Sequence, residues 1–450
     1  MFSVMRKAEK FINEAQFTKI MKFASIQEAL DKKSGKVAIR GWVWRERGSN
    51  KLKFLVLRDS TNIIQCVLKR EKFEKQWGAI DKLQVEASVE LEGEIHEDKR
   101  APTGYELRAT KINIAGESEN FPIQKDQSQE LLLDMRHLAL RSRRMIATLK
   151  IRDTILKAMR DHWRKKGFIE YHSPTLIGMQ CEGGATLFKV NYYGDEVFLA
   201  QTWQLHAEPA IFALEKIFTI QPAFRAEKSK TSRHLSELWM AEMEVAWEGF
   251  DYLQDDVEQL LKYIVKTVLK ENKKELAILE RDVKKLEPTI KKKLPRITYD
   301  DVLKLLKEKK NMKVQWGKDL RTIEEDKLSE LFDTPVIVTK YPKIVKAFYM
   351  KEDTKNPKTV LGFDVIAPEH YGEITGGSER EESIEKLKQN LKSQGEDPSK
   401  YEFYFDTRRY GSVPHGGYGV GVERVVSWIC GLDNIKDAIP FPRTINRYKP

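Results

Sequence analysis

The stretch FRAEKSKTSRHLSELWMAEMEVAW, residues 224–247, decides the expected fold. An apolar run, IFTIQPA, precedes it, and apolar and acidic residues alternate after its polar centre, so the pattern predicts a strand, a loop and a second strand. Arg225 and Glu227 stand where the first strand ends, and Glu242 and Glu244 alternate along the second. An arginine before the loop and acids after it can hold a phosphate against a cation. A plain surface hairpin would use the same residues in ion pairs.

Two further segments combine charged residues with glycines. In GFDVIAPEHYGEITGGSERE, residues 362–381, Asp364 and Glu373 precede a glycine pair, and two such acids can share Mg²⁺, which takes oxygen ligands. In YGSVPHGGYGVGVERVVSWI, residues 410–429, small residues let the backbone approach a ligand closely, and Arg424 begins an apolar helix. A glycine turn of this kind is weak evidence when it stands alone.

The N-terminal part of the chain has a different pattern. Between Val37 and Gly116, five short alternating or β-rich runs are separated by turns, which predicts a small barrel with the OB-fold as the leading candidate. Such barrels bind oligonucleotides by stacking bases on aromatic side chains and meeting phosphates with basic ones. The aromatics could equally fill the barrel core. The residues of these types are Trp42, Trp44, Arg40, Arg45, Arg47, Phe54 and Arg58.

Composition narrows the class of protein without deciding it. The chain has 450 residues, 41% hydrophobic and 33% charged, which predicts two or three folded domains and excludes a wholly disordered chain. Its net charge of +11 fits a lysine-rich solvated surface or a polyanionic partner such as nucleic acid. No apolar run approaches the about 20 residues of a membrane span. Cys66, Cys181 and Cys430 lie far apart, which fits a reducing cytosol.

Changes of pattern along the chain indicate five segments. Residues 1–20 have the spacing of a short amphipathic helix, and the barrel is expected over 21–118. A polar stretch over 119–140 indicates a linker, and the remaining domain is expected over 141–450. Within it, the Lys- and Glu-rich residues 251–335 indicate a helical insertion with a solvated face.

Together these segments resemble the motif regions of class II aminoacyl-tRNA synthetases. The hairpin at 224–247 resembles motif 2, the strand and helix around Arg424 resemble motif 3, and EYHSPTL, residues 170–176, resembles the end of motif 1, the dimer element. The ending GLDNIKDAIPFPR, residues 431–443, and the N-terminal barrel are typical of the aspartyl, asparaginyl and lysyl subgroup. The resemblance implies an α+β fold, in which an OB-fold β-barrel precedes an antiparallel β-sheet flanked by helices. It also implies a homodimer in the cytoplasm that activates an amino acid with ATP and esterifies tRNA.

The resemblance assigns roles at the nucleotide. Arg225 would bind the α-phosphate and the reacting carboxylate, and guanidinium suits this because it is planar, bidentate and permanently charged. Glu227 would contact adenine, and Arg424 would lie near the γ-phosphate and the leaving pyrophosphate. Asp364 and Glu373 would hold Mg²⁺.

The amino-acid pocket decides the substrate that the resemblance implies. Glu182 and Gln204 match residues that hold the α-amino group, and Arg380 matches the arginine that binds the side-chain oxygen. Aspartyl enzymes place a lysine where this chain has Ala207, and they usually have aspartate at the position of Glu242. Glu242 could accept hydrogen bonds from an amide but would repel a second carboxylate. The resemblance therefore implies an asparagine–tRNA ligase acting on tRNA(Asn).

The barrel supplies an anticodon-binding set by the same resemblance. Phe54 and Gln65 are eleven residues apart, as in the pair that stacks on and hydrogen-bonds the central anticodon uridine, and Arg58 matches a neighbouring contact. Stacking of this kind is worth about 1–3 kcal/mol per base.

Four positions near the nucleotide and amino acid qualify this interpretation. His234 would either face the triphosphate or be an exposed loop residue. Leu238 would meet adenine at a position where the family usually has a stacking aromatic residue. Trp203 stands where the family has a small residue or proline and could narrow the amino-acid pocket, and His206 stands where the family has tyrosine. Two alternatives stay open. One is an aspartyl-tRNA synthetase, including one that also charges tRNA(Asn). The other is a paralogue resembling asparagine synthetase, a class that lacks the barrel and does not charge tRNA.

Overall fold

The computed structural model describes residues 22–124, 126–179, 187–228 and 231–450. The chain divides into two compact units, Met1–Gln129 and Glu130–Pro450. The expected helix at 1–20 lies outside the described residues. Among those that are described, no helix combines the length and the apolar character that crossing a membrane requires.

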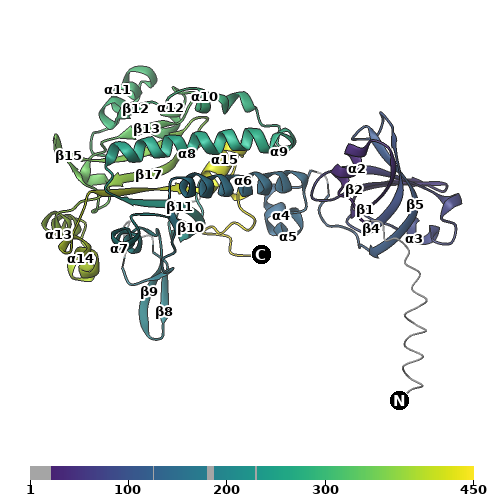
Figure 1. Ribbon diagram of the computed structural model, residues 1–450, viewed down its shortest axis with the longest axis horizontal. Coiled ribbons are helices and arrows are strands. Elements are labelled where there is room, and N and C mark those ends of the chain that lie inside the picture. Colours follow the sequence, from purple (N-terminus) through teal and green to yellow (C-terminus); the bar gives the residue numbers. More distant parts are fainter. Residues whose placement is uncertain (1–21, 125, 180–186, 229–230) are drawn as a thin grey trace, which may run out of the picture. The chain divides into compact units, whose positions relative to one another are not determined.

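The first unit is a closed five-stranded barrel, which confirms the predicted OB-fold (Figure 1). Its strands are β1 (Gly35–Ser49), β2 (Leu52–Arg58), β3 (Ile63–Lys69), β4 (Ser88–Glu97) and β5 (Tyr105–Gly116), in the order β1-β2-β3-β5-β4. Two short helices, α2 (Ile26–Lys32) and α3 (Trp77–Asp81), accompany them. Alternation along β2 and β3 sends Leu55, Leu57, Ile64 and Cys66 into the core and leaves the residues between them on the outer face.

The second unit is built on an eight-stranded sheet in the order β12-β13-β16-β17-β18-β11-β10-β6. Neighbours are antiparallel except at the two edges, where β12 pairs with β13 and β6 with β10 in parallel. The expected antiparallel sheet is thus confirmed from β13 through β10, and one parallel strand is added at each edge. The strands are β6 (Ile169–Glu170), β10 (Lys216–Phe224), β11 (Glu237–Ala246), β12 (Arg296–Thr298), β13 (Val336–Thr339), β16 (Gly362–Ala367), β17 (Gly372–Glu379) and β18 (His415–Gly421).

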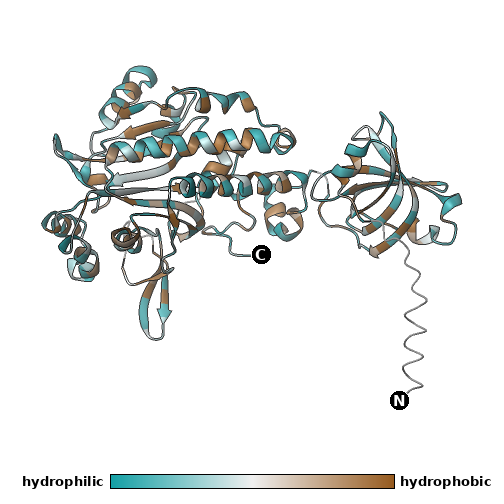
Figure 2. Cartoon of the chain, viewed as in Figure 1, coloured by the Kyte–Doolittle hydropathy of each residue, from teal (hydrophilic) through white to brown (hydrophobic). Residues whose placement is uncertain are grey.

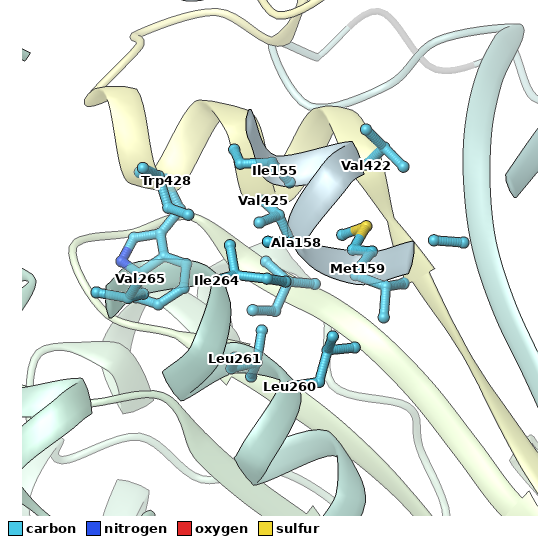
Figure 3. Packing of buried hydrophobic residues seen from close by; sticks show 14 of the residues in the cluster. Ile155, Ala158, Met159, Leu260, Leu261, Ile264, Val265, Val422, Val425 and Trp428 are labelled. Carbon is cyan, nitrogen blue, oxygen red and sulfur yellow. The ribbon is translucent and has the colours of Figure 1, made fainter. Parts of the chain in front are cut away.

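Three helices form the main core of this unit with the sheet. They are α6 (Arg143–Lys165), α8 (Phe250–Glu271) and α15 (Val422–Cys430). Apolar and polar residues alternate along α6 and α8 in Figure 2, the pattern of helices with one buried face. In Figure 3, Ile155 and Met159 of α6, Leu261 and Ile264 of α8 and Val425 of α15 meet in one cluster. This packing fixes the helical layer against the strands that carry the charged motifs.

The remaining elements surround this core. Two small sheets contain β7 (Leu176–Ile177), β8 (Lys189–Tyr192) and β9 (Asp195–Leu199), and β14 (Glu352–Asp353) and β15 (Asn356–Val360). The other helices are α4 (Gln129–Asp134), α5 (Arg136–Ala139), α7 (Gln204–Leu214), α9 (Lys273–Ile278), α10 (Glu287–Lys291), α11 (Tyr299–Lys310), α12 (Thr322–Ser329), α13 (Ile384–Ser393) and α14 (Glu402–Arg409).

The segment 251–335 differs from the expected solvated insertion. Helix α8 buries a continuous apolar face in the main core, with Leu253, Val257 and Leu260 fully buried, and β12 forms one edge of the large sheet. The Lys and Glu residues that suggested a solvated segment belong to its outer faces. Helix α8 is therefore part of the core, and β12 is an edge strand of the large sheet, so neither belongs to a solvated insertion.

The expected linker at 119–140 is also shorter in the structure. Its second half contains α4 and α5 and belongs to the second unit. Arg136 is buried there and donates to the carbonyl groups of Lys436, Ile439 and Pro440. Those hydrogen bonds attach the segment around Arg136 to the second unit.

Candidate active site

The charged motifs meet because their strands are neighbours in the centre of the sheet. Strands β10 and β11 form the predicted hairpin, and the backbone N–H of Arg225 donates to the Ser236 carbonyl at 2.9 Å, which closes the base of its loop. Strand β11 pairs on its other side with β18, and β18 pairs with β17. Four adjacent strands thus carry three segments that are far apart in sequence.

These strands form the floor of a cavity of about 540 Å³. Alternation along β11 turns Glu242 toward this cavity and Ala241 and Met243 into the helical core. Every predicted site residue of this domain lines the cavity, except Glu182, which lies outside the described residues. The lining residues predicted from sequence are Gln204, Arg225, Glu227, His234, Leu238, Glu242, Asp364, Glu373, Arg380 and Arg424.

One end of the cavity is rich in half-buried guanidinium groups. Burial lowers the pKa of His234, and the positive charges of Arg424, Arg225 and Arg233 lower it further against the opposing effect of Glu227. The imidazole therefore favours its neutral form in a strongly positive environment. Arg424 donates through Nη1 to the backbone carbonyl of Glu373, which fixes its guanidinium at the end of β17. The negative charge of a triphosphate would be stabilised by these guanidinium groups.

Carboxylates converge beside these arginines. A Cβ placed on Gly376 would lie 3.3 Å from Glu373 Oε1 and 3.4 Å from Asp364 Oδ1, so both carboxylates flank the same point of β17, which continues as a strand through Gly376 and Gly377. Burial raises the pKa of Asp364, against the effect of Lys346, whose Nζ donates to Asp364 Oδ2 at 2.6 Å. Burial also raises the pKa of Glu325 to about 7, and the charge of Glu373 adds to the rise.

This donor set fits a cation that shares its coordination with a ligand. Among the described residues, no three His, Cys, Asp or Glu side chains gather closely enough to hold a metal ion by themselves. Two carboxylates are nevertheless what Mg²⁺ ordinarily takes from a protein, with phosphate oxygens and water completing its shell. Asp364 and Glu373 therefore fit a magnesium ion that arrives with a nucleotide.

The other end of the cavity is deeply buried. Arg380 is 3% exposed and is held by Glu244, which accepts from its Nε at 3.3 Å, and by Ser378, which accepts from its Nη1 at 2.7 Å. Glu242 accepts from the Thr202 hydroxyl and, at 3.3 Å, from the Trp203 backbone N–H. This end thus presents a fixed cation and a fixed carboxylate together.

The Glu244 carboxylate that holds Arg380 is itself perturbed. Burial raises its pKa to about 7, Arg380 opposes this rise, and the charges of Glu208 and Glu242 add to it. Glu242 and Glu244 therefore lie beside one arginine at this end of the cavity, while the charge of Glu208 is balanced by Arg408.

Trp203 does not narrow the pocket. Its ring is fully buried in a separate apolar cluster with Ala207, Ile211 and Ile217, on the side away from the cavity, so the prediction that it could narrow the pocket is wrong. Ala207 is fully buried in the same cluster, so a lysine side chain at this position would not fit beside Arg380 as a second cation. Leu238 does line the cavity and packs beside Leu235, so an aliphatic surface stands where the resemblance implies an aromatic one.

The structure adds cavity residues that the sequence did not single out. Arg233 lies in the loop of the hairpin 224–247, and its closeness in sequence to Arg225 could have indicated a place in the same site. Lys346 is one of four lysines between positions 340 and 351, and Glu325 lies in the Lys- and Glu-rich stretch interpreted as solvated. The position of Lys346 and Glu325 at the cavity follows only from the tertiary fold, which brings β16 and α12 beside β17.

The barrel presents its predicted residues on one outer face. Phe54 and Arg58 alternate outward along β2, and Gln65 is the diagonal neighbour of Phe54 across β3. Arg47 joins the pair, because its guanidinium lies 4.9 Å from the Phe54 ring centroid and donates to Gln65 Oε1 at 3.2 Å. Gln65 also donates to Glu106 at 3.2 Å, a residue that the sequence did not single out.

Arg58 occupies a different environment on this face. It is 5% exposed and forms an ion pair with Glu86 at 2.9 Å, with its guanidinium 5.6 Å from the Trp42 ring centroid. Phe54 and Gln65 therefore lie together, whereas the charge of Arg58 is already paired. Trp42 is 45% exposed, so the aromatics of this face do not fill the core.

Comparison with known proteins agrees with this geometry. The family described as tRNA synthetases class II (D, K and N) matches residues 128–445, and the OB-fold nucleic acid binding domain matches residues 37–115. The chain belongs to the class II tRNA synthetases of this subgroup, which use ATP.

Individual relatives narrow the comparison within the subgroup. An asparagine–tRNA ligase of Thermoplasma acidophilum is 44% identical over 416 residues, 92% of this chain and 96% of that protein. One of Lactobacillus johnsonii is 44% identical over 428 residues, 95% of this chain and 99% of that protein. The crystal structure of asparaginyl-tRNA synthetase from Pyrococcus horikoshii complexed with asparaginyl-adenylate matches with a TM-score of 0.92 and 42% identity, over 96% of this chain and 100% of that one.

Proposed function

We propose that this protein is an asparagine–tRNA ligase, which activates asparagine with ATP and transfers it to tRNA(Asn). The observation that carries the proposal is the single cavity that Arg225, Arg424, Glu242 and Arg380 line together. It combines a cationic end suited to a triphosphate with a buried end suited to a small polar amino acid.

Activation needs positioning and charge stabilisation more than covalent help. An oxygen of the asparagine carboxylate attacks the α-phosphorus of ATP and forms a new O–P bond. The bond from that phosphorus to the bridging oxygen breaks, and pyrophosphate leaves with its electron pair. Arg225 binds the α-phosphate and the attacking carboxylate, Arg424 stabilises the pyrophosphate, and Glu227 contacts adenine. A ribose hydroxyl at the tRNA end then attacks the carbonyl carbon, an ester forms and AMP leaves.

Selection of asparagine rests on one donor and one acceptor. Arg380 donates to the side-chain carbonyl, and Glu242 accepts from the side-chain NH₂. Aspartate would bring a second carboxylate against Glu242, and Ala207, which is buried among apolar residues, supplies no cation to balance it. Like charges in a buried site cost several kcal/mol in comparable interfaces.

We also propose Mg²⁺ as the cofactor, held by Asp364 and Glu373. Once bound, the ion would neutralise phosphate charge near the α-phosphorus. The chain's own part is to keep these carboxylates beside Gly376 of β17, with Lys346 balancing the charge of Asp364.

The barrel is proposed to bind the anticodon of tRNA(Asn). Phe54 stacks on the central base, Gln65 hydrogen-bonds its edge, and Arg58 contributes a neighbouring contact. The net charge of +11 adds an affinity for phosphates that is independent of sequence and weakens with salt.

We propose that the protein is a cytoplasmic homodimer. Several large apolar side chains are exposed around the region that resembles motif 1, and a second copy would cover them. They are Ile169, Leu176, Tyr192, Tyr193, Leu214 and Trp247. The free, buried thiols of Cys66 and Cys430 fit a reducing compartment. Light scattering should give a mass of about twice the 52.4 kDa chain.

Two assays test the function. ATP–pyrophosphate exchange should depend on asparagine, and exchange with aspartate alone would replace this assignment with an aspartyl enzyme. Charging of a tRNA that carries a GUU anticodon should follow. Exchange without charging would favour a paralogue that makes adenylate for another purpose.

A further inference from the structure

A fully buried carboxylate stands behind the amino-acid end of the cavity. Glu208 lies on α7, one helical turn after Gln204, and has 0% exposure. It does not line the cavity, so it cannot contact a bound amino acid directly. A buried charge in such a place requires partners, and those partners define what it does.

Its contacts come from three separate elements. Glu208 Oε1 accepts from Gln204 Nε2 at 2.8 Å and from the Tyr404 hydroxyl at 2.8 Å. Glu208 Oε2 accepts from Arg408 Nη2 at 2.6 Å and faces His415 Nε2 at 3.2 Å. Burial alone would raise the pKa of Glu208, but Arg408 and His415 outweigh it and hold the pKa well below its ordinary value. Glu208 is therefore ionised and acts only as an acceptor.

An acceptor at this point selects one orientation of the Gln204 amide. The NH₂ group must face Glu208, since the opposite orientation would set the amide oxygen against a carboxylate. Gln204 Oε1 is then left for the cavity that Gln204 lines. There it is an acceptor, which is what a substrate α-ammonium group requires.

The same carboxylate also lies near the other end of the substrate site. Glu208 Oε1 is 3.9 Å from Arg380 Nε, the group proposed to serve the asparagine side chain. Glu208 thus lies between the residues proposed for the two ends of asparagine. Its direct hydrogen bonds are with Gln204, Tyr404 and Arg408, however, so within the amino-acid site it acts on Gln204.

We propose that Glu208 is a positioning residue of the amino-acid site, which fixes the Gln204 amide with its oxygen toward the substrate α-ammonium group. The inference rests on the proposed function, because it takes asparagine as the ligand. It differs from a purely structural role, in which Glu208 would only neutralise buried Arg408.

Glu208→Gln tests this, because glutamine keeps the shape and lets the Gln204 amide turn over. In pyrophosphate exchange the KM for asparagine should rise about 10- to 100-fold, as expected when a hydrogen bond to a charged group is lost. The KM for ATP should stay within twofold. Succinamate, which is asparagine without its α-amino group, should inhibit wild type and variant with equal Ki. A purely structural role would instead weaken succinamate and asparagine alike.

Two further variants make the outcome decisive. Tyr404→Phe removes another hydrogen bond to the same carboxylate oxygen without touching Gln204, and should leave the KM for asparagine within twofold. In a Gln204→Ala background, Glu208→Gln should have no further effect, whereas additive losses would overturn the proposal.

A further variant covers the case in which Glu208→Gln does not fold. If Glu208→Gln does not fold, Glu208→Asp keeps the charge beside Arg408 but cannot reach Gln204, and should give the same selective rise in KM. An unchanged KM in a folded variant, with an active wild type, overturns only this inference. A wild type that does not exchange with asparagine overturns the proposed function itself.

Discussion

The two ends of the cavity are organised differently. At the amino-acid end, Gln204, Glu242 and Arg380 are at most 5% exposed, and neighbouring side chains already hold each of them. At the nucleotide end, Arg225 and Arg424 are only half-buried, and the hairpin loop carries much of the charge. Selection of a small substrate needs fixed partners, whereas a triphosphate brings its own charge and can order the groups around it.

This difference predicts how each end responds to substitution. A change at the nucleotide end should act mainly on the rate, since charge develops there during the reaction. A change at the amino-acid end should act on the choice of substrate and, through buried charges, on stability. The barrel provides a third case, because its aromatic face should affect only the step that involves tRNA.

Arg225→Ala should have the largest effect. Loss of the guanidinium at the α-phosphate should lower the rate of pyrophosphate exchange about 100- to 1000-fold, the size of effect seen when one preorganised donor is removed. Thermal unfolding should change little, because Arg225 is half-buried at the end of a strand. Lys228→Ala, in the exposed part of the same loop, is the matched control. Near-normal exchange would remove Arg225 from this role.

Glu242→Gln should act on discrimination. The variant keeps an acceptor for Thr202 but no longer repels aspartate, so the asparagine-to-aspartate ratio of kcat/KM should fall about 10- to 100-fold. Glu237→Gln, at the start of the same strand, should leave the ratio unchanged. A constant ratio in Glu242→Gln would show that discrimination arises elsewhere.

Asp364→Asn should act on the metal requirement. The MgCl₂ concentration for half-maximal exchange should rise at least about 10-fold, the loss that even outer-shell partners of a metal produce. Excess Mg²⁺ should restore most of the rate, because Glu373 and the phosphates remain. If the rate falls at every Mg²⁺ concentration with an unchanged midpoint, Asp364 does not bind the metal.

Local patterns explain what the sequence could predict. Alternation along β2 and β11 depends only on neighbouring residues, so Leu55 and Leu57 indicated a barrel and Glu242 and Glu244 indicated a strand with one polar face. The resemblance to the synthetase motifs then indicated residues that line one cavity, because the strands that carry the motifs are neighbours in the sheet. The assignment of 251–335 failed for a related reason. Lys and Glu residues on outer faces dominate the composition of 251–335, and an average over that whole segment hides the buried face of α8.

Contacts between distant parts of the chain explain what the sequence could not predict. Glu208 meets Tyr404, Arg408 and His415 about 200 residues later, and nothing near position 208 in the sequence indicates them. Trp203 is similar, since only the start of α7 decides whether its ring faces the cavity or the apolar cluster behind it. Both cases concern the direction of a side chain, which depends on tertiary packing.

Phe54→Ala should have the smallest effect on amino-acid activation, and it separates the barrel from the cavity. Loss of one stacked base should raise the KM for tRNA about 5- to 150-fold, which corresponds to about 1–3 kcal/mol, while pyrophosphate exchange stays unchanged. The Phe54 ring is on the outer face beside Arg47, so its removal leaves the core residues Leu55 and Leu57 in place. If exchange and charging fall together, the variant has lost its fold or the barrel supports the catalytic step. Charging at two salt concentrations separates stacking from phosphate binding, because only the second depends strongly on salt.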